Sequence, residues 1–98
     1  MYNIKMDSQA TEDLNEILDY IFRFSFSFDT VNKIHDEIMW KILGLKIFPN
    51  MYPIFIWDLR VMTVRNKYRI FYKVDEISQI VTIYYIFGSE ENYDDLIH

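Results

Sequence analysis

The sequence predicts one α+β domain with the element order β-α-α-β-β-β, in which the two consecutive helices form a hairpin. Apolar residues recur at spacings of three and four in residues 10–21 and again in residues 31–45, which is the period of an amphipathic helix. After Pro49 the chain changes to residues that favour strands. Because 98 residues suffice for one core, we expect a single domain over residues 1–98.

Composition narrows the classes of function. The chain has no cysteine, and neither histidine has a partner at metal-ligand spacing, so we expect no metal and no cofactor. The net charge of -5 disfavours generic nucleic-acid binding, which relies on many Lys and Arg contacts to phosphates. The N-terminal residues lack the apolar core of a secretory signal, and the longest apolar stretch, Ile80 to Gly88, is too short to span a bilayer. We therefore expect a cytoplasmic protein that does not engage a membrane.

The first elements are a strand over residues 2–6 and a helix over residues 8–24. Asp7 or Ser8 supplies the N-cap of this helix. Its apolar stripe consists of Ala10, Leu14, Ile17, Leu18 and Ile21, and its acidic residues Glu12, Asp13, Glu16 and Asp19 are expected on the opposite side. That side is interpreted as a solvated face, with docking of a basic partner as the alternative.

A second helix follows after a tight connection. Ser27 or Asp29 caps it, and its apolar stripe runs through Val31, Ile34, Ile38, Ile42 and Leu45 to about residue 47, where Pro49 ends the helix. Residues 22–28 alternate Phe with Arg or Ser, a pattern that also suits a strand, but we expect these phenylalanines to clamp the ends of two antiparallel helices.

Three strands are predicted in the second half, over residues 54–65, 68–75 and 79–87. Asn66 and Lys67 join the first two in a hairpin turn of two residues or more. Gly88 closes the last strand. We expect the acidic tail that follows to add a helical turn against the sheet.

The run from Arg60 to Glu76 carries half of the basic residues of this acidic chain, namely Arg60, Arg65, Lys67, Arg69 and Lys73. Because they are interleaved with strand-forming residues, the run predicts a hairpin with one cationic face that binds a macromolecular target. The alternative is a solvated face with exposed ion pairs to Asp58 and Asp75, and an Arg60–Asp58 pair is as well supported as a target contact.

Aromatic residues raise two further questions. Trp40 lies off the apolar stripe of its helix, so Trp40 and Trp57 are predicted to contact a partner protein or a second copy. Tyr72, Tyr84 and Tyr85 are expected in the core, with stacking on nucleobases as the alternative.

Three segments, in this order and spacing, resemble the RelE/ParE superfamily of toxins from bacterial type II toxin-antitoxin modules, also known as addiction or plasmid stabilisation modules. The stretch A-T-E-D-L-N-E-I-L-D-Y-I at residues 10–21 is similar to the first helix of that family. The stretch I-L-G-L-K-I-F-P at residues 42–49 is similar to the end of its second helix, and Y-R-I-F-Y-K-V-D-E at residues 68–76 to its central strand. The resemblance implies a RelE/ParE-like fold, in which the helical hairpin packs on one face of a mainly antiparallel sheet. It also implies a cognate antitoxin that wraps the toxin, as a dimer or a heterotetramer.

The resemblance leaves three functions open. The preferred one is growth arrest by binding an essential machine, with DNA gyrase as the target, as in the ParE branch. The second is cleavage of ribosome-bound mRNA as in the RelE branch, with Arg69 and Arg65 on the scissile phosphate and Tyr93 or Glu90 handling protons. Two positions where the cleaving branch has basic residues are Val61 and Thr63 here, which disfavours cleavage. The third is an inactive relative that only binds antitoxin.

Overall fold

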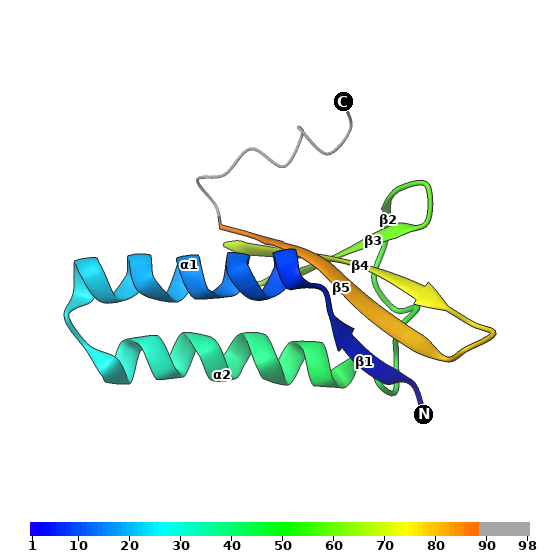
Figure 1. The fold of residues 1–98 in the computed structure, drawn as a ribbon, viewed down its shortest axis with the longest axis horizontal. Coiled ribbons are helices and arrows are strands. Elements are labelled where there is room, and N and C mark those ends of the chain that lie inside the picture. Colours follow the sequence, from blue (N-terminus) through cyan, green and yellow to red (C-terminus); the bar gives the residue numbers. More distant parts are fainter. Residues whose placement is uncertain (89–98) are drawn as a thin grey trace.

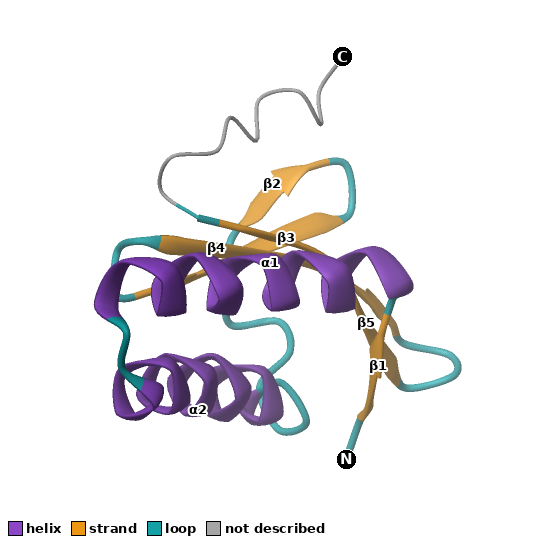
Figure 2. Ribbon diagram, turned by 60° about the vertical axis from the view of Figure 1, so that its left-hand side comes forward, coloured by secondary structure: helices purple, strands orange, loops and turns teal. Residues whose placement is uncertain are grey.

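The structure, a computed structural model, describes residues 1–88 and shows a helical hairpin laid against one face of a five-stranded sheet (Figures 1 and 2). Its elements are β1 (Asn3–Met6), α1 (Ser8–Ser25), α2 (Phe28–Gly44), β2 (Ile54–Ile56), β3 (Leu59–Val64), β4 (Tyr68–Asp75) and β5 (Ile80–Phe87). The strand order is β1-β5-β4-β3-β2, with β1 parallel to β5 and the other pairs antiparallel. The α+β class and the mainly antiparallel sheet are thus confirmed, with one strand more than the sequence predicted.

Both helices form where their patterns indicated. The side chain of Asp7 accepts a hydrogen bond from the backbone N–H of Gln9, and that of Ser27 accepts one from Thr30, so each helix begins at a residue that satisfies a free amide. Apart from Val31, the residues of the two predicted apolar stripes form the core or pack against it, together with side chains of β3, β4 and β5. This core holds the helices to the sheet, while the tip of the hairpin extends past the strands (Figure 1).

The end of α2 is earlier than expected. The helix stops at Gly44, and the next residues tighten into successive i to i+3 hydrogen bonds, from Leu45 N to Ile42 O at 3.0 Å and from Lys46 N to Leu43 O at 3.1 Å. This narrower winding is a common way to end a helix, because it satisfies carbonyls that have lost their i+4 partners.

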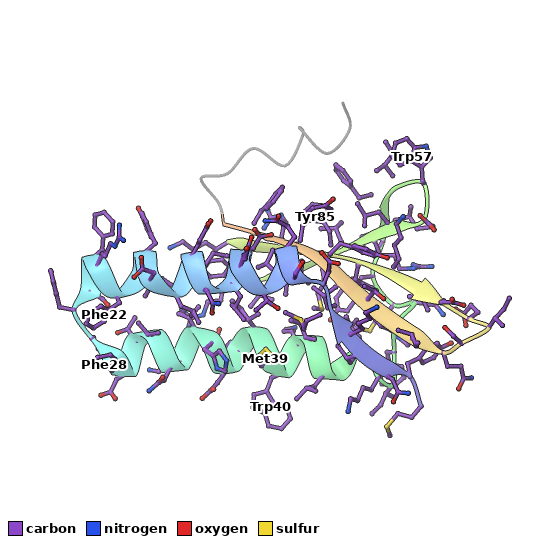
Figure 3. All side chains as sticks on the ribbon, in the orientation of Figure 1. Phe22, Phe28, Met39, Trp40, Trp57 and Tyr85 are labelled. Atoms are coloured by element: carbon purple, nitrogen blue, oxygen red, sulfur yellow. The ribbon has the colours of Figure 1, made fainter. Side chains whose placement is uncertain are left out.

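At the tip of the hairpin, the predicted aromatic clamp is confirmed in part. The rings of Phe22 and Phe28 stack with centroids 4.7 Å apart, one from each helix (Figure 3). Phe24 and Phe26 instead point outward and are 72% and 81% exposed. Phe22 thus closes the tip, while its neighbours leave apolar surface in solvent.

The predicted strand over residues 54–65 is wrong in one respect, because it is folded into the hairpin β2–β3. Trp57, with a φ of 51°, turns the chain between Ile56 and Leu59, and Val61 N donates to Pro53 O at 3.0 Å. Turns of this kind are usually marked by Gly, Asn or Asp, because a positive φ is uncommon for a residue with a bulky side chain. Since Trp57 occupies this position, the local sequence did not indicate a turn here.

The β3–β4 connection contains three residues rather than two. Arg65 and Asn66 have φ values of 58° and 55°, and Lys67 N donates to Val64 O at 3.0 Å. This turn sets the register in which Thr63 pairs with Arg69 and Arg60 with Tyr72, and side chains that pair in this way share a face of the sheet.

Asp13 is buried, which corrects its placement on a solvated side of α1. Because β1 pairs with only four residues of β5, the rest of that strand edge is open to α1. The Asp13 carboxylate accepts hydrogen bonds from Ile86 N at 3.0 Å and from the side chain of Gln9 at 2.9 Å. The acid therefore takes the place of a missing neighbouring strand.

The loop between α2 and β2 is held against the helix-covered face of the sheet by polar contacts. The Tyr72 hydroxyl donates to Pro49 O at 2.7 Å, and a guanidinium nitrogen of Arg60 donates to Tyr52 O at 2.6 Å. Glu76 accepts hydrogen bonds from the Tyr2 hydroxyl at 2.5 Å and from the Asn50 side chain at 3.0 Å.

Across residues 1–88, no helix has the length and apolar character needed to cross a membrane.

Candidate functional site

The candidate site is the face of the sheet turned away from the helices, which we call the open face. Residues 68, 70, 72 and 74 of β4 pack toward the helical hairpin, so the alternate residues Arg69, Phe71 and Lys73 lie on the open face. The register extends each of them into a row across the neighbouring strands. The rows are Thr63–Arg69–Phe87, Val61–Phe71–Tyr85 and Lys73–Thr82–Lys5.

Arg69 occupies the first row, between a small hydroxyl side chain and an aromatic ring. Its Nη1 is buried and has no hydrogen-bond partner within residues 1–88. A buried guanidinium N–H that lacks an acceptor is costly, and native structures usually satisfy such groups. Arg69 therefore keeps a hydrogen-bond donor that these residues leave unsatisfied, and a carboxylate, a carbonyl or a phosphate is the kind of acceptor that matches it.

An aromatic cluster surrounds Arg69. Phe71 lies in the middle row and is fully buried, although it is on the open face. Its ring packs edge-on against Phe55 at 5.2 Å and against Phe87 at 5.7 Å, and Tyr85 lies 6.0 Å from Phe87. This cluster fixes the surface from which Arg69 projects.

A bulge in β5 adds a second tyrosine to the same face. Phe71 pairs with Tyr85, whereas the next residue, Tyr72, pairs with Ile83, so Tyr84 is the extra residue. The ammonium of Lys73 lies 5.6 Å from the centroid of the Tyr84 ring, which places both side chains on the open face. The expectation of core packing is thus confirmed for Tyr72, which is fully buried, and wrong for Tyr84 and Tyr85.

The third row borders a cavity of about 530 Å³ beside the turn that joins β4 to β5. Lys5, Lys73, Thr82 and Tyr84 line one part of it, and Asp58, Asp75 and Glu76 contribute acidic groups. The Lys73 ammonium lies 3.4 Å from Asp58 in the β2–β3 turn, which is the ion pair expected under the alternative of a solvated face. With two basic and three acidic side chains, the lining of this cavity is slightly acidic.

Arg60 lies on the other face of the sheet. Because it pairs with Tyr72, its side chain points to the helix-covered side, where it donates to Tyr52 O at 2.6 Å and Asn50 O at 3.3 Å. The prediction of one cationic face is therefore wrong for this residue, and no Arg60–Asp58 ion pair forms. Arg60 secures the loop before β2 instead.

Arg65 is engaged by α2. Its Nη2 donates to a carboxylate oxygen of Glu37 at 2.6 Å, and its Nε donates to the other oxygen, so the pair is bidentate. These hydrogen bonds lower the pKa of Glu37 below its ordinary value of 4.5 and raise the pKa of Arg65. Lys67, next to this turn, lies over the ring of Tyr68 at 5.9 Å. The structure thus does not bring Arg65 and Lys67 to the row of Arg69.

The remaining candidate residues lie elsewhere. Trp40 and Trp57 are each 75% exposed, Trp40 on the side of α2 away from α1 and Trp57 at the tip of the β2–β3 hairpin (Figure 3). Tyr93, Glu90 and the helical turn expected in the tail lie outside the described residues.

In the chain up to Gly88, no three His, Cys, Asp or Glu side chains gather as a metal site would require.

Sequence reasoning missed Lys5 and the aromatic cluster. Lys5 reaches the open face because β1 pairs in parallel with β5, a contact between residues 77 positions apart that no local pattern marks. Phe71 and Phe87 did carry a signal, since they alternate with core residues along their strands, and period-two alternation places such neighbours on opposite faces.

A helical hairpin on one face of a five-stranded mixed sheet matches the fold of the RelE/ParE superfamily of toxins. The profile described as "ParE toxin of type II toxin-antitoxin system, parDE" matches residues 4–93. The chain belongs to this family, which confirms the resemblance read from the sequence.

Solved structures agree on the fold. A chain of the chromosomal ParDE TA system from P. aeruginosa superposes with a TM-score of 0.77 at 19% identity, covering 92% of this chain and 98% of that one. The isolated E. coli RelE toxin gives 0.63 at 14% identity, with 99% and 96% covered. A chain of the intact E. coli RelBE toxin-antitoxin complex gives 0.60 at 14%, with 94% and 100% covered. No curated protein sequence matches the chain significantly.

Proposed function

We propose that this ParE-family toxin arrests bacterial growth by binding DNA gyrase through its open face. The observation that carries the proposal is the environment of Arg69, whose row partners are Thr63 and Phe87 and whose neighbouring row is Val61, Phe71 and Tyr85. One available guanidinium within an apolar and aromatic surface suits the centre of a protein interface, where Arg, Tyr and Phe are enriched.

Cleavage of RNA makes different demands. Attack of a 2′-hydroxyl needs a base beside it, an acid beside the leaving oxygen and a cation for the phosphoryl oxygens. Within residues 1–88, the row of Arg69 supplies the cation, while Thr63 and Phe87 do not titrate near neutral pH. Membership of the ParE family supports the same preference.

A cognate antitoxin is the second proposed partner. The family is defined as the toxin half of a toxin-antitoxin pair, and similar chains come from ParDE and RelBE systems. Trp40 and Trp57, both largely exposed, are the proposed contacts, because large aromatic side chains left in solvent commonly become buried at partner surfaces.

Controlled expression in bacteria tests the proposal. Growth should stop on induction, double-strand breaks and an SOS response should follow, and purified gyrase should accumulate cleaved DNA when the protein is added. Arg69→Ala should abolish these effects while the circular dichroism spectrum and the Tm stay close to those of the wild type. Arg23→Ala is the matched control, since this exposed arginine pairs only with Asp19 on the surface of α1. Full toxicity of Arg69→Ala would remove the open face from the mechanism.

Ribosome-dependent mRNA cleavage remains a second candidate because of one observation, the buried Nη1 of Arg69 that lacks an acceptor. A phosphate oxygen is a suitable acceptor for it. Mapping transcript ends after induction separates the two functions, because cleavage gives cuts at codon-spaced positions and gyrase poisoning does not. A chain that binds antitoxin yet leaves growth unaffected would instead be an inactive relative.

A further inference from the structure

The turn between β3 and β4 directs one arginine away from the open face. Thr63 lies on that face because it pairs with Arg69, and a strand that continued regularly would place Arg65, two residues later, on the same face. Arg65 instead has a φ of 58°, in the left-handed region, and its guanidinium binds Glu37 of α2. The turn therefore sends this cation toward the helical hairpin.

The conformation of Arg65 is not the one that its residue type favours. Arg65 and Asn66 both have a positive φ. They occupy the centre of the turn that the hydrogen bond from Lys67 N to Val64 O closes, and Asn, Asp and Gly are preferred at such positions. A left-handed conformation costs an arginine free energy. An arginine kept there, with a carboxylate partner on another element, indicates that the direction of its side chain matters.

Glu37 holds the guanidinium through two of its nitrogens. Arg65 Nη2 donates to one carboxylate oxygen at 2.6 Å, and Arg65 Nε donates to the other oxygen. This bidentate geometry fixes the plane of the guanidinium as well as its position. The two side chains are nevertheless 43% and 39% exposed, so solvent reaches the pair. Glu37 thus occupies the fork of donors that a phosphate from solution would otherwise bind.

The capture of Arg65 lowers the positive charge of the open face. Apart from Arg69, the residues of the two rows nearest the turn are uncharged. A nucleic-acid backbone binds through several cations, because each phosphate contact adds affinity. If Arg65 were released, it would lie about 7 Å along the strand direction from Thr63, the residue that pairs with Arg69. Two arginines would then serve one stretch of phosphates.

We propose that Glu37 is a specificity-determining residue of this toxin: it holds Arg65 against α2 and thereby keeps nucleic acid off the open face, which stays selective for a protein target. This inference rests on the proposed function, in which the open face binds a protein. Glu37 acts through Arg65 and does not itself touch the target, so it is a positioning residue.

Binding of a fluorescent single-stranded RNA oligonucleotide to the full-length chain, measured by anisotropy at low salt, tests the proposal. Glu37→Ala should strengthen RNA binding by about 10-fold, the effect of one added phosphate contact. The slope of log K against log salt should steepen by about 0.7, the value for one contact to a single strand. Asp36→Ala is the matched control: it removes the same charge one residue earlier, where the carboxylate pairs with His35, and should change the affinity much less.

A second arginine variant assigns the gain to Arg65. Adding Arg65→Ala to Glu37→Ala should abolish the gain, whereas Arg65→Ala alone should leave the weak RNA binding of the wild type unchanged. Glu37→Gln, which keeps a neutral acceptor for Arg65, should give a smaller gain than Glu37→Ala. Circular dichroism and the Tm of each variant monitor the fold. A purely structural contact would lower the Tm in these variants without changing the affinity for RNA.

The possible results separate this inference from the proposed function. If Glu37→Ala binds RNA no better than Asp36→Ala does, Glu37 does not set specificity and the inference is wrong. If Arg65→Ala alone weakens RNA binding, Arg65 already serves the open face, and the inference is overturned as well. If the RNA gain occurs as expected but the wild type leaves gyrase unaffected, the proposed function fails while the hold of Glu37 on Arg65 stands.

Discussion

The Tyr72 side chain connects the sheet to the loop that follows α2. It is fully buried, and its hydroxyl donates to Pro49 O at 2.7 Å. Burial raises the pKa of Tyr72 to about 12, so this phenol stays protonated when exposed tyrosines have ionised. This hydroxyl therefore helps to hold the loop that leads to β2, together with Arg60.

Tyr72→Phe should lower the free energy of unfolding by about 1–2 kcal/mol, because Pro49 O loses its buried donor. Urea denaturation at pH 7 measures this loss. Tyr68→Phe is the control, since Tyr68 is also buried but no hydrogen bond of its hydroxyl occurs within residues 1–88. Equal losses in the two variants would show that the Tyr72 hydrogen bond contributes nothing specific.

At the level of single residues, the candidate site could be predicted from the sequence only in part. The strand that carries Arg69 was predicted correctly, because Tyr-Arg-Ile-Phe-Tyr surrounds the arginine with residues that favour strands. The partners of Arg65 and Arg60 could not be predicted. Glu37 lies 28 residues before Arg65, and the acceptors of Arg60 are backbone carbonyls of a loop, which no side-chain pattern reveals.

Among the elements, the edge of β5 beyond β1 depends on Asp13. Asp13→Ala should destabilise the protein by about 1.5–3 kcal/mol, the usual loss for a hydrogen bond to a charged group, because Ile86 N would be left buried without an acceptor. Denaturant unfolding checks the value. Asp13→Asn keeps an acceptor and should lose less, and Glu16→Ala on the exposed side of α1 should change little.

The β2–β3 turn holds Trp57 at a positive φ with its ring in solvent. The backbone of Trp57 is therefore strained, and burial of the ring does not offset the cost of this strain. Trp57→Asn should therefore raise the free energy of unfolding by about 0.5–1 kcal/mol, because Asn tolerates this conformation better. Trp40→Asn provides the comparison, since the same change in regular helix should be slightly destabilising. A loss of stability in Trp57→Asn would mean that the indole makes a contact that its exposure does not reveal.

The helices were predictable because their apolar stripes repeat over several turns and their caps are local. The β2–β3 turn and the β5 bulge were not, because each depends on tertiary pairing. Trp57 carries no turn signal, and the extra residue Tyr84 in β5 has a side chain that suits a regular strand as well.

For the molecule as a whole, three carboxyl groups have lowered pKa values: Glu37 and Glu76 join separate parts of the fold, and Asp75 caps the turn between β4 and β5. Hydrogen bonds from Arg65 lower the pKa of Glu37, those from Tyr2 and Asn50 lower that of Glu76, and those from Ser78 and Ile77 lower that of Asp75. A group whose folded pKa lies below its unfolded value stabilises the fold above the unfolded pKa, and this contribution disappears as the pH falls through the folded pKa.

Stability should accordingly decline as the pH falls below about 4.5, the ordinary value of a glutamate. The double variant Glu37→Gln/Glu76→Gln should be less stable than the wild type at pH 7, and the difference should shrink at pH 3. Thermal unfolding across this range measures both. Glu12→Gln, an exposed glutamate on α1, serves as control and should follow the wild-type curve. Parallel curves for the double variant and the wild type would contradict the assignment.

The parallel pairing of β1 with β5 has a consequence for the way the protein is made. Asn3 pairs with Ile80, so β1 cannot take its place in the sheet until β5 has been synthesised. Closing so long a loop is slow and costs chain entropy, and it cannot begin while the later residues are still untranslated. The nascent chain therefore completes this sheet only after residues 80–83 have left the ribosome. The proposed antitoxin would accordingly meet a folded sheet only after that point in synthesis.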